Sequence, residues 1–128
     1  KDYHLPKKVE NVAQRAALAA ELQAAALVTA AGVRAEELMP YVKDTLELAA
    51  SFVGETAKHV DERTYPGDLS TATMMGATAD HIVAASRTAG IDLALPESVK
   101  SHYDAAIAAG RGGDSWTVLF EFIKKSGR

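Results

Sequence analysis

The stretch YPGDLSTATMMGATADH, residues 65–81, combines a turn signal with the beginning of a helix. Pro66 and Gly67 interrupt regular structure. Asp68 or Ser70 can then accept hydrogen bonds from the first free N–H groups of a helix that follows. Two methionines and a histidine come next, so apolar and titratable side chains gather directly after a turn.

Apolar residues on both sides of this stretch recur at three- and four-residue steps, the spacing of one helix face. The expected helices cover residues 7–31, 40–62, 69–89, 96–109 and 115–125. Gly32 and Gly90 stand where left-handed residues commonly end helices, and Asp114 is a suitable N-cap for the last helix. We therefore predict an all-α bundle of about five principal helices in a single domain, residues 1–128.

Composition excludes several classes of function. The chain has 128 residues, a net charge of −3 and no cysteine. Its basic residues are scattered, so no nucleic-acid footprint is visible, and no apolar run approaches the roughly 20 residues that span a membrane. The absence of cysteine removes thiolate chemistry and fits a reducing, cytoplasmic location. The four histidines lack the spacing of a helical metal site, so none is predicted.

The glycine cluster at residues 110–113 fits neither common phosphate-binding motif. A dinucleotide fingerprint needs its glycines directly after a buried strand, and a P-loop needs a Gly-Lys-Ser/Thr ending. We interpret the cluster as a turn between helices. Any nucleotide cofactor must therefore be bound mostly elsewhere.

Met74, Met75 and His81 are candidates for lining a site. The two methionines are adjacent, so they project about a hundred degrees apart and at most one points squarely into a core. Helix packing is the usual role of methionine. His81 follows Met74 by nearly two turns on a similar face, where a hydrogen-bonded structural role is the commoner one.

Two other helix ends carry polar residues, at residues 7–11 and at residues 58–63. The helix dipole disfavours the charged form of an amine at a helix N-terminus, which makes proton transfer from it easier. Lys7 and Lys8 are therefore candidates for proton transfer. Lys8 and Asn11 are three residues apart and share one side of the helix. The charged run at residues 58–63 is predicted to be a solvated face.

Four segments together resemble one known family: Tyr65-Pro66-Gly67-Asp68, Asp80-His81-Ile82-Val83, residues 89–96 and residues 108–114. They are similar to the C-terminal domain of imine reductases and reductive aminases. These enzymes are NADPH-dependent members of the 6-phosphogluconate dehydrogenase and β-hydroxyacid dehydrogenase group. The resemblance runs from about residue 12 to the end with segment lengths preserved.

The resemblance implies a two-domain parent protein. An N-terminal Rossmann domain, absent from this chain, would hold most of the NADP cofactor, and two chains would interlock as a homodimer. The parent would transfer hydride from NADPH to a C=N or C=O carbon of a small-molecule substrate. This part would supply substrate-pocket walls and dimer contacts, and it would be inactive by itself.

The resemblance also nominates site residues. Met74 and Met75 would line the substrate pocket together with Thr45, whose position often carries a large aromatic residue. His81 is also nominated as a substrate-binding residue. Lys8 and Asn11 match a Lys-x-x-Asn motif that opens the first helix in β-hydroxyacid dehydrogenases, whereas the register counted from the end of that helix favours Lys7. Imine reductases usually carry Asp or Tyr there; the available residues of those types are Asp2 and Tyr3.

Two other interpretations remain open. The chain could be an independent helical module for dimerisation or ligand sensing without catalysis. It could also be a free-standing enzyme that uses His81 with Asp80 or a lysine. Asp80 and His81 are neighbours and diverge on a helix, which counts against an orienting pair.

Overall fold

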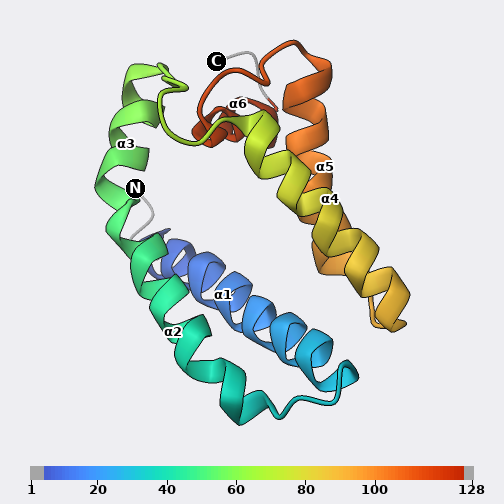
Figure 1. Cartoon of the computed structure of the whole chain (residues 1–128). Coiled ribbons are helices and arrows are strands. Elements are labelled where there is room, and N and C mark those ends of the chain that lie inside the picture. The colour runs from blue at the N-terminus through green and yellow to red at the C-terminus, as the bar shows by residue number, and fades with distance from the viewer. Residues whose placement is uncertain (1–4, 126–128) are drawn as a thin grey trace.

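The computed structural model describes residues 5–125 and is all-α, as predicted (Figure 1). The elements in order are α1 (Leu5–Ala30), α2 (Ala35–Ser51), α3 (Val53–Glu62), α4 (Ala72–Ala89), α5 (Ala94–Ala108), the 3-10 helix η1 (Trp116–Val118) and α6 (Leu119–Ile123). Within the described range the only β-type pairing is an isolated bridge between Thr71 and Ser115.

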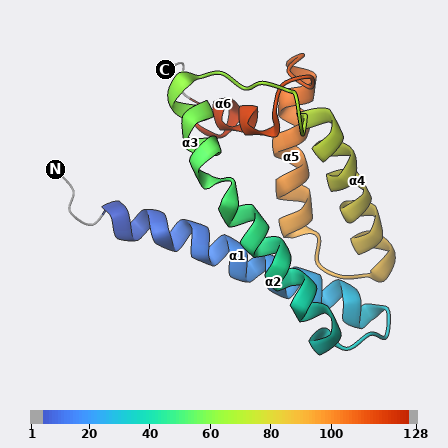
Figure 2. The same ribbon diagram turned by 60° about the vertical axis from the view of Figure 1, so that its left-hand side comes forward.

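Two antiparallel helix pairs form the body of the molecule. The first pair is α1 with α2, and the second is α4 with α5, which make the most extensive contact of any two helices (Figure 1). The helix α3 continues upward from α2, and η1 and α6 pack between the ends of α3 and α5. The first turns of α1 reach outward beyond the other helices in the turned view (Figure 2).

The second expected helix is longer and is broken. We expected it to begin at Pro40, but α2 begins at Ala35, after a capping box in which the backbone N–H of Arg34 donates to Glu37 (3.3 Å). Pro40 lies inside the helix, where it leaves one carbonyl without its usual donor. The continuous helix to residue 62 was also wrong, because Phe52 separates α2 from α3.

Different residues cap two helices from those expected. The cap of α4 is Thr71, whose Oγ1 accepts from the Met74 N–H at 3.2 Å, so neither Asp68 nor Ser70 has this role. The last helical segment is capped by Ser115 in place of Asp114. In both cases the turn before the helix is longer than the sequence pattern indicated, which shifts the cap towards the C-terminus.

Every buried residue of the described chain lies between Tyr65 and Leu119. The centre of this core is Val118, with Ala72 and Ala106 also fully enclosed. Small residues let α4 and α5 approach closely: a Cβ added to Gly76 would lie 3.2 Å from the Cβ of Tyr103. The core is therefore built from α4, α5, η1 and the turns between them.

Residues 5–62 bury no residue fully, although α1 alone has 26 residues. Val12 and Leu22 on α1 are each 72% exposed, and Tyr41 on α2 is 71% exposed. The chain exposes 8884 Å² in total, whereas a compact protein of its mass, 13.5 kDa, exposes about 6,500 Å². Helices that have one apolar face without a covering layer contribute to this excess.

Candidate functional site

A groove of about 510 Å³ opens where α2 and α3 face the turns that flank the core. Its apolar lining comes from four different elements. The apolar residues that line it are Leu48, Ala49, Phe52, Pro66, Leu69, Met75, Tyr103 and Trp116. A groove of this size and character suits a small organic molecule.

Thr45 on α2 and Met75 on α4 both line this groove. Both are residues that the family resemblance predicts in a substrate pocket. Met75 is 38% exposed, whereas its neighbour Met74 is 60% exposed and does not line the groove. The two methionines thus diverge, as adjacent helix positions must.

A chain of polar contacts forms one side of the groove. The His59 Nδ1 lies 2.9 Å from the Thr117 hydroxyl, which lies 3.0 Å from the Ser115 hydroxyl. The His59 side chain is only 12% exposed, and its Nε2 lies 3.6 Å from a carboxylate oxygen of Glu55. Thr117 and Ser115 are buried, so this chain fixes the imidazole against the core.

The charged side chains that line the groove are acidic. Glu55 and Asp68 are among its lining residues, and no Lys or Arg of the described chain is. Glu55 and His59 also border a neighbouring hollow that contains Lys58. The groove itself therefore disfavours a negatively charged ligand at this side.

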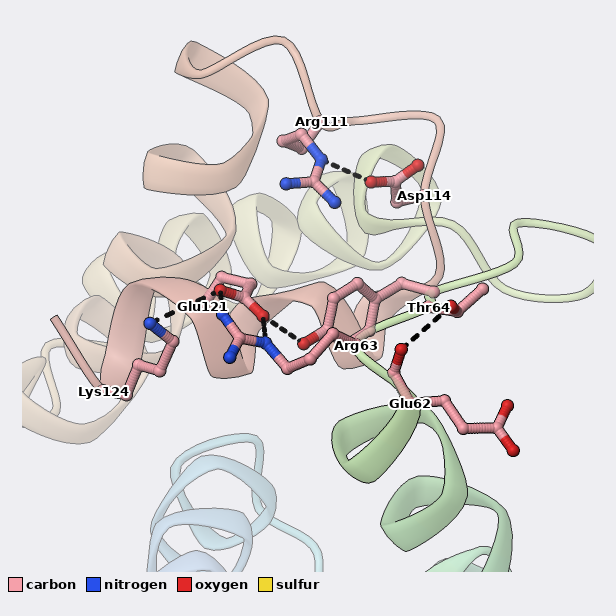
Figure 3. A network of polar contacts seen from close by, with 8 residues as sticks. Glu62, Arg63, Thr64, Arg111, Asp114, Glu121 and Lys124 are labelled. Carbon is pink, nitrogen blue, oxygen red and sulfur yellow. Dashed lines mark hydrogen bonds and ion pairs between the residues drawn. The ribbon is translucent and has the colours of Figure 1, made fainter. Parts of the chain in front are cut away.

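A cluster of polar contacts fixes the turn after α3, which forms one wall of the groove (Figure 3). Arg63 and the Tyr65 hydroxyl both donate hydrogen bonds to the Glu121 carboxylate on α6, and Lys124 lies 3.5 Å from it. Hydrogen bonds from Arg63 and then Tyr65 lower the pKa of Glu121 to about 2. Burial, followed by the bond to Glu121, raises the pKa of the Tyr65 phenol.

Residues 58–63 are mostly solvated, as predicted, since Lys58, Asp61, Glu62 and Arg63 are exposed; the prediction lacked the partners of Arg63 and of the half-buried His59. Arg63 adopts a left-handed backbone (φ 52°) at the end of α3 and turns its guanidinium towards Glu121. His59 is enclosed by Thr117, as described above. Periodicity alone could not show this, because the partners lie 58 positions further along the chain.

The glycine turn packs against the beginning of α4. The N–H groups of Ala72 and Thr73 donate to the carbonyls of Asp114 (2.9 Å) and Gly112 (3.0 Å). A Cβ on Gly67 would lie 2.0 Å from the carbonyl oxygen of Gly113, so the two turns touch through their backbones. The free N–H groups of α4 are thus satisfied internally, and the glycine cluster acts as an interhelical turn.

The other nominated residues lie away from this groove. His81 is exposed on α4 and does not line it. Lys7, Lys8 and Asn11 lie in the first turns of α1, where Lys7 pairs with Glu10 at 3.7 Å. Their catalytic assignment stays a prediction, and Asp2 and Tyr3 lie outside the described residues.

Among residues 5–125, no group of three or more histidine or acidic side chains is arranged to hold a metal ion. None of the described helices has the length and apolar character that a membrane span requires.

The sequence analysis missed the polar side of the groove. Glu55 and His59 are four residues apart, a spacing that places them on one helix face, and this signal was available. Ser115 and Thr117 carried none, because their burial depends on contacts between distant segments.

Comparison with known proteins gives a consistent result. Residues 2–125 match the family model described as NADPH-dependent reductive aminase-like, C-terminal domain. A search of curated proteins gives no match.

Several solved structures are similar over nearly the whole chain. An imine reductase from Bacillus cereus has 31% sequence identity and a TM-score of 0.90, covering 95% of this chain and 43% of that one. A reductive aminase from Aspergillus terreus in complex with NADPH and ethyl levulinate has 25% identity and a TM-score of 0.88, with coverages of 93% and 42%. An imine reductase from Streptomyces aurantiacus has 27% identity and a TM-score of 0.86, with coverages of 94% and 42%. The chain spans less than half the length of these relatives.

Proposed function

Because this chain belongs to the NADPH-dependent reductive aminase-like family through its C-terminal domain, we propose that it is the helical part of an oxidoreductase. The whole protein would reduce a C=N or C=O substrate with NADPH. The observation that carries this proposal is the groove in which Thr45 and Met75 meet. It supplies an apolar wall of the right size for a small carbonyl or imine compound.

The cofactor would be held mainly by a nucleotide-binding domain outside these 128 residues. When bound, it supplies the hydride that adds to the substrate carbon. This chain's groove residues would exclude water and orient the substrate, since Leu48, Phe52 and Trp116 present apolar surface there. The threonine at position 45 leaves the pocket wider and more polar than a large aromatic residue would.

The chain would form a homodimer through its uncovered helices. The surface in excess of the compact expectation is about 2,400 Å² for one chain, or about 4,800 Å² for two chains, and obligate dimers bury about 2,000–5,000 Å² over both partners. Val12 and Leu22 on α1 would be covered in this way. Each active site would then use both chains, and the 128-residue chain alone would be inactive.

The proton donor would come from the beginning of α1. Lys7, Lys8 and Asn11 lie there, and the second chain of a dimer could bring them to a groove that they do not reach within one chain. A cytoplasmic location agrees with the absence of cysteine.

The test is turnover by the full-length protein. Oxidation of NADPH is followed with cyclohexanone plus methylamine, with a cyclic imine and with a keto acid. We expect turnover with the imine-forming pair and none from the 128-residue chain. A full-length protein that binds NADPH but reduces none of these compounds would contradict the proposal and favour a non-catalytic helical module.

The groove has its own test within that assay. Thr45→Trp narrows the pocket, so we expect KM to rise at least severalfold for bulky ketones and less for cyclohexanone. Thr29→Val, at an exposed α1 threonine outside this groove, is the matched control. Equal effects of both variants on KM would contradict the assignment of Thr45 to the substrate pocket.

A further inference from the structure

The polar side of the groove has no role in hydride transfer as proposed above. His59 Nε2 and the nearest Glu55 oxygen are 3.6 Å apart, which is longer than a hydrogen bond. Nε2 therefore keeps hydrogen-bonding capacity that Glu55 does not use. The Glu55 side chain is 54% exposed and can adjust to a bound group.

The buried end of the polar chain decides what His59 can offer. The Thr117 hydroxyl donates to Ser115 Oγ at 3.0 Å, and this uses its single proton. With the Thr117 proton in that bond, the tautomer that fits the 2.9 Å contact is the one in which Nδ1–H of His59 donates to Thr117 Oγ1. In the neutral imidazole this leaves the lone pair on Nε2, so Nε2 and the Glu55 carboxylate are two adjacent acceptors.

Charge narrows the class of group that these acceptors suit. The groove is lined by two carboxylates, of Glu55 and Asp68, and by no basic side chain of the described residues; Lys58 borders only the neighbouring hollow. A carboxylate substituent would meet like charge, whereas an ammonium group would meet opposite charge and hydrogen-bond acceptors.

We propose that His59 and Glu55 determine specificity by binding a protonated amino group that the substrate carries away from its reacting carbon. The inference deepens the proposed function and rests on it. The preferred substrates would be ketones or imines with a second, basic nitrogen. Ser115 and Thr117 would act as positioning residues that hold the imidazole in its accepting form.

The test compares two ketones of equal shape in the full-length enzyme, with methylamine as the common amine. One is a cyclohexanone that carries a dimethylamino group on methylene linkers of increasing length, and the other carries isopropyl in place of dimethylamino. The tertiary amine cannot itself form an imine. We expect the wild type to favour the amino ketone in kcat/KM by about tenfold at the best linker length, through KM, as one charge-assisted hydrogen bond would give.

Four variants separate a direct contact with the ammonium group from a general effect of charge. Glu55→Gln and His59→Phe should lose most of the preference, and His59→Gln, which keeps an acceptor, should retain part of it. Glu62→Gln removes an equal charge from the end of the same helix outside the groove and should keep the preference. The ratio is taken within each variant, so a loss of folded enzyme cancels.

Equal preference in the wild type and Glu55→Gln would overturn the inference, as would an equal loss in Glu62→Gln. If neither ketone is reduced, the proposed function fails separately. Calorimetric titration of the same two ketones into the wild type and Glu55→Gln then decides: tighter binding of the amino ketone only in the wild type supports the pair, and equal affinities overturn it.

Discussion

Residues 65–119 and residues 5–62 are both helical and both rich in alanine and aliphatic residues, yet they bury their side chains differently. The first region encloses Val118 and Ala72 completely. The second buries no residue fully, and leaves Val12 and Leu22 largely in water. A helix with an apolar face gains most of its stability when that face is covered, so residues 65–119 complete their own core, whereas residues 5–62 leave apolar faces uncovered that the proposed dimer would cover.

We call residues 65–119 the self-sufficient region. The largest expected effect there comes from the backbone contact between the two glycine turns. In Gly67→Ala the new methyl group would meet the Gly113 carbonyl at 2.0 Å, and backbone cannot move aside cheaply. We expect a loss of about 3 kcal/mol in the free energy of unfolding, measured by urea denaturation. A loss below about 0.5 kcal/mol would show that the turns do not touch.

A valine in each region allows a direct comparison. Val118→Ala removes two methyl groups from a fully buried side chain and should cost about 2 kcal/mol. Val12→Ala removes the same atoms from a side chain that is 72% exposed and should change stability by less than about 0.5 kcal/mol at low protein concentration. Similar losses for both variants, seen in denaturant midpoints, would erase the distinction between the regions.

The Glu121 cluster, which ties Arg63 and Tyr65 to α6 at the edge of the core, predicts an effect of pH on stability. The folded-state pKa of Glu121, about 2, is below the ordinary value of 4.5, so its stabilising contribution is present above about pH 4.5 and is lost as pH falls towards 2. Glu121→Gln should be less stable than the wild type at pH 7, and this difference should shrink at about pH 3. Denaturation curves at both pH values measure it, and a constant difference would contradict the assignment.

The smallest expected change is a gain in stability from a substitution in residues 5–62. Gly54 lies in α3 with no atom within 4 Å of an added Cβ, so Gly54→Ala should stabilise the chain by up to about 1 kcal/mol. The same substitution at Gly67 should have the opposite sign. Thermal unfolding of the two variants side by side checks this, and a destabilised Gly54→Ala would mean that the helix is covered after all.

Local sequence signals predicted the helices well, because periodicity and helix-ending glycines act within a few residues. Gly32 and Gly90 end α1 and α4 in the left-handed conformation, as expected. The break at Phe52 and the cap at Thr71 were missed. The cap at Thr71 goes with pairing to a distant segment, since Thr71 bridges to Ser115 and the Ala72 N–H donates to the Asp114 carbonyl, which no local pattern encodes.

The lining of the groove was predictable only on its apolar side. Thr45 and Met75, nominated through a family resemblance, both line the groove, and their role in substrate binding stays a prediction. The contact between His59 and Thr117 joins residues 58 positions apart, and burial of Thr117 exists only in the folded core. The resemblance indicated positions on the apolar side, whereas the polar side could be found only from the folded structure.

Hydrogen exchange on the 128-residue chain, measured at low and high protein concentration, tests the contrast between the regions most directly. We predict that amides of α1 and α2 gain protection as concentration rises while those of α4 and α5 stay constant. Leu22→Glu, at a site 72% exposed on α1, should abolish the gain. Protection of α1 that is already high and independent of concentration, in a chain that sediments as a monomer throughout, would contradict the claim that these helices await a second copy.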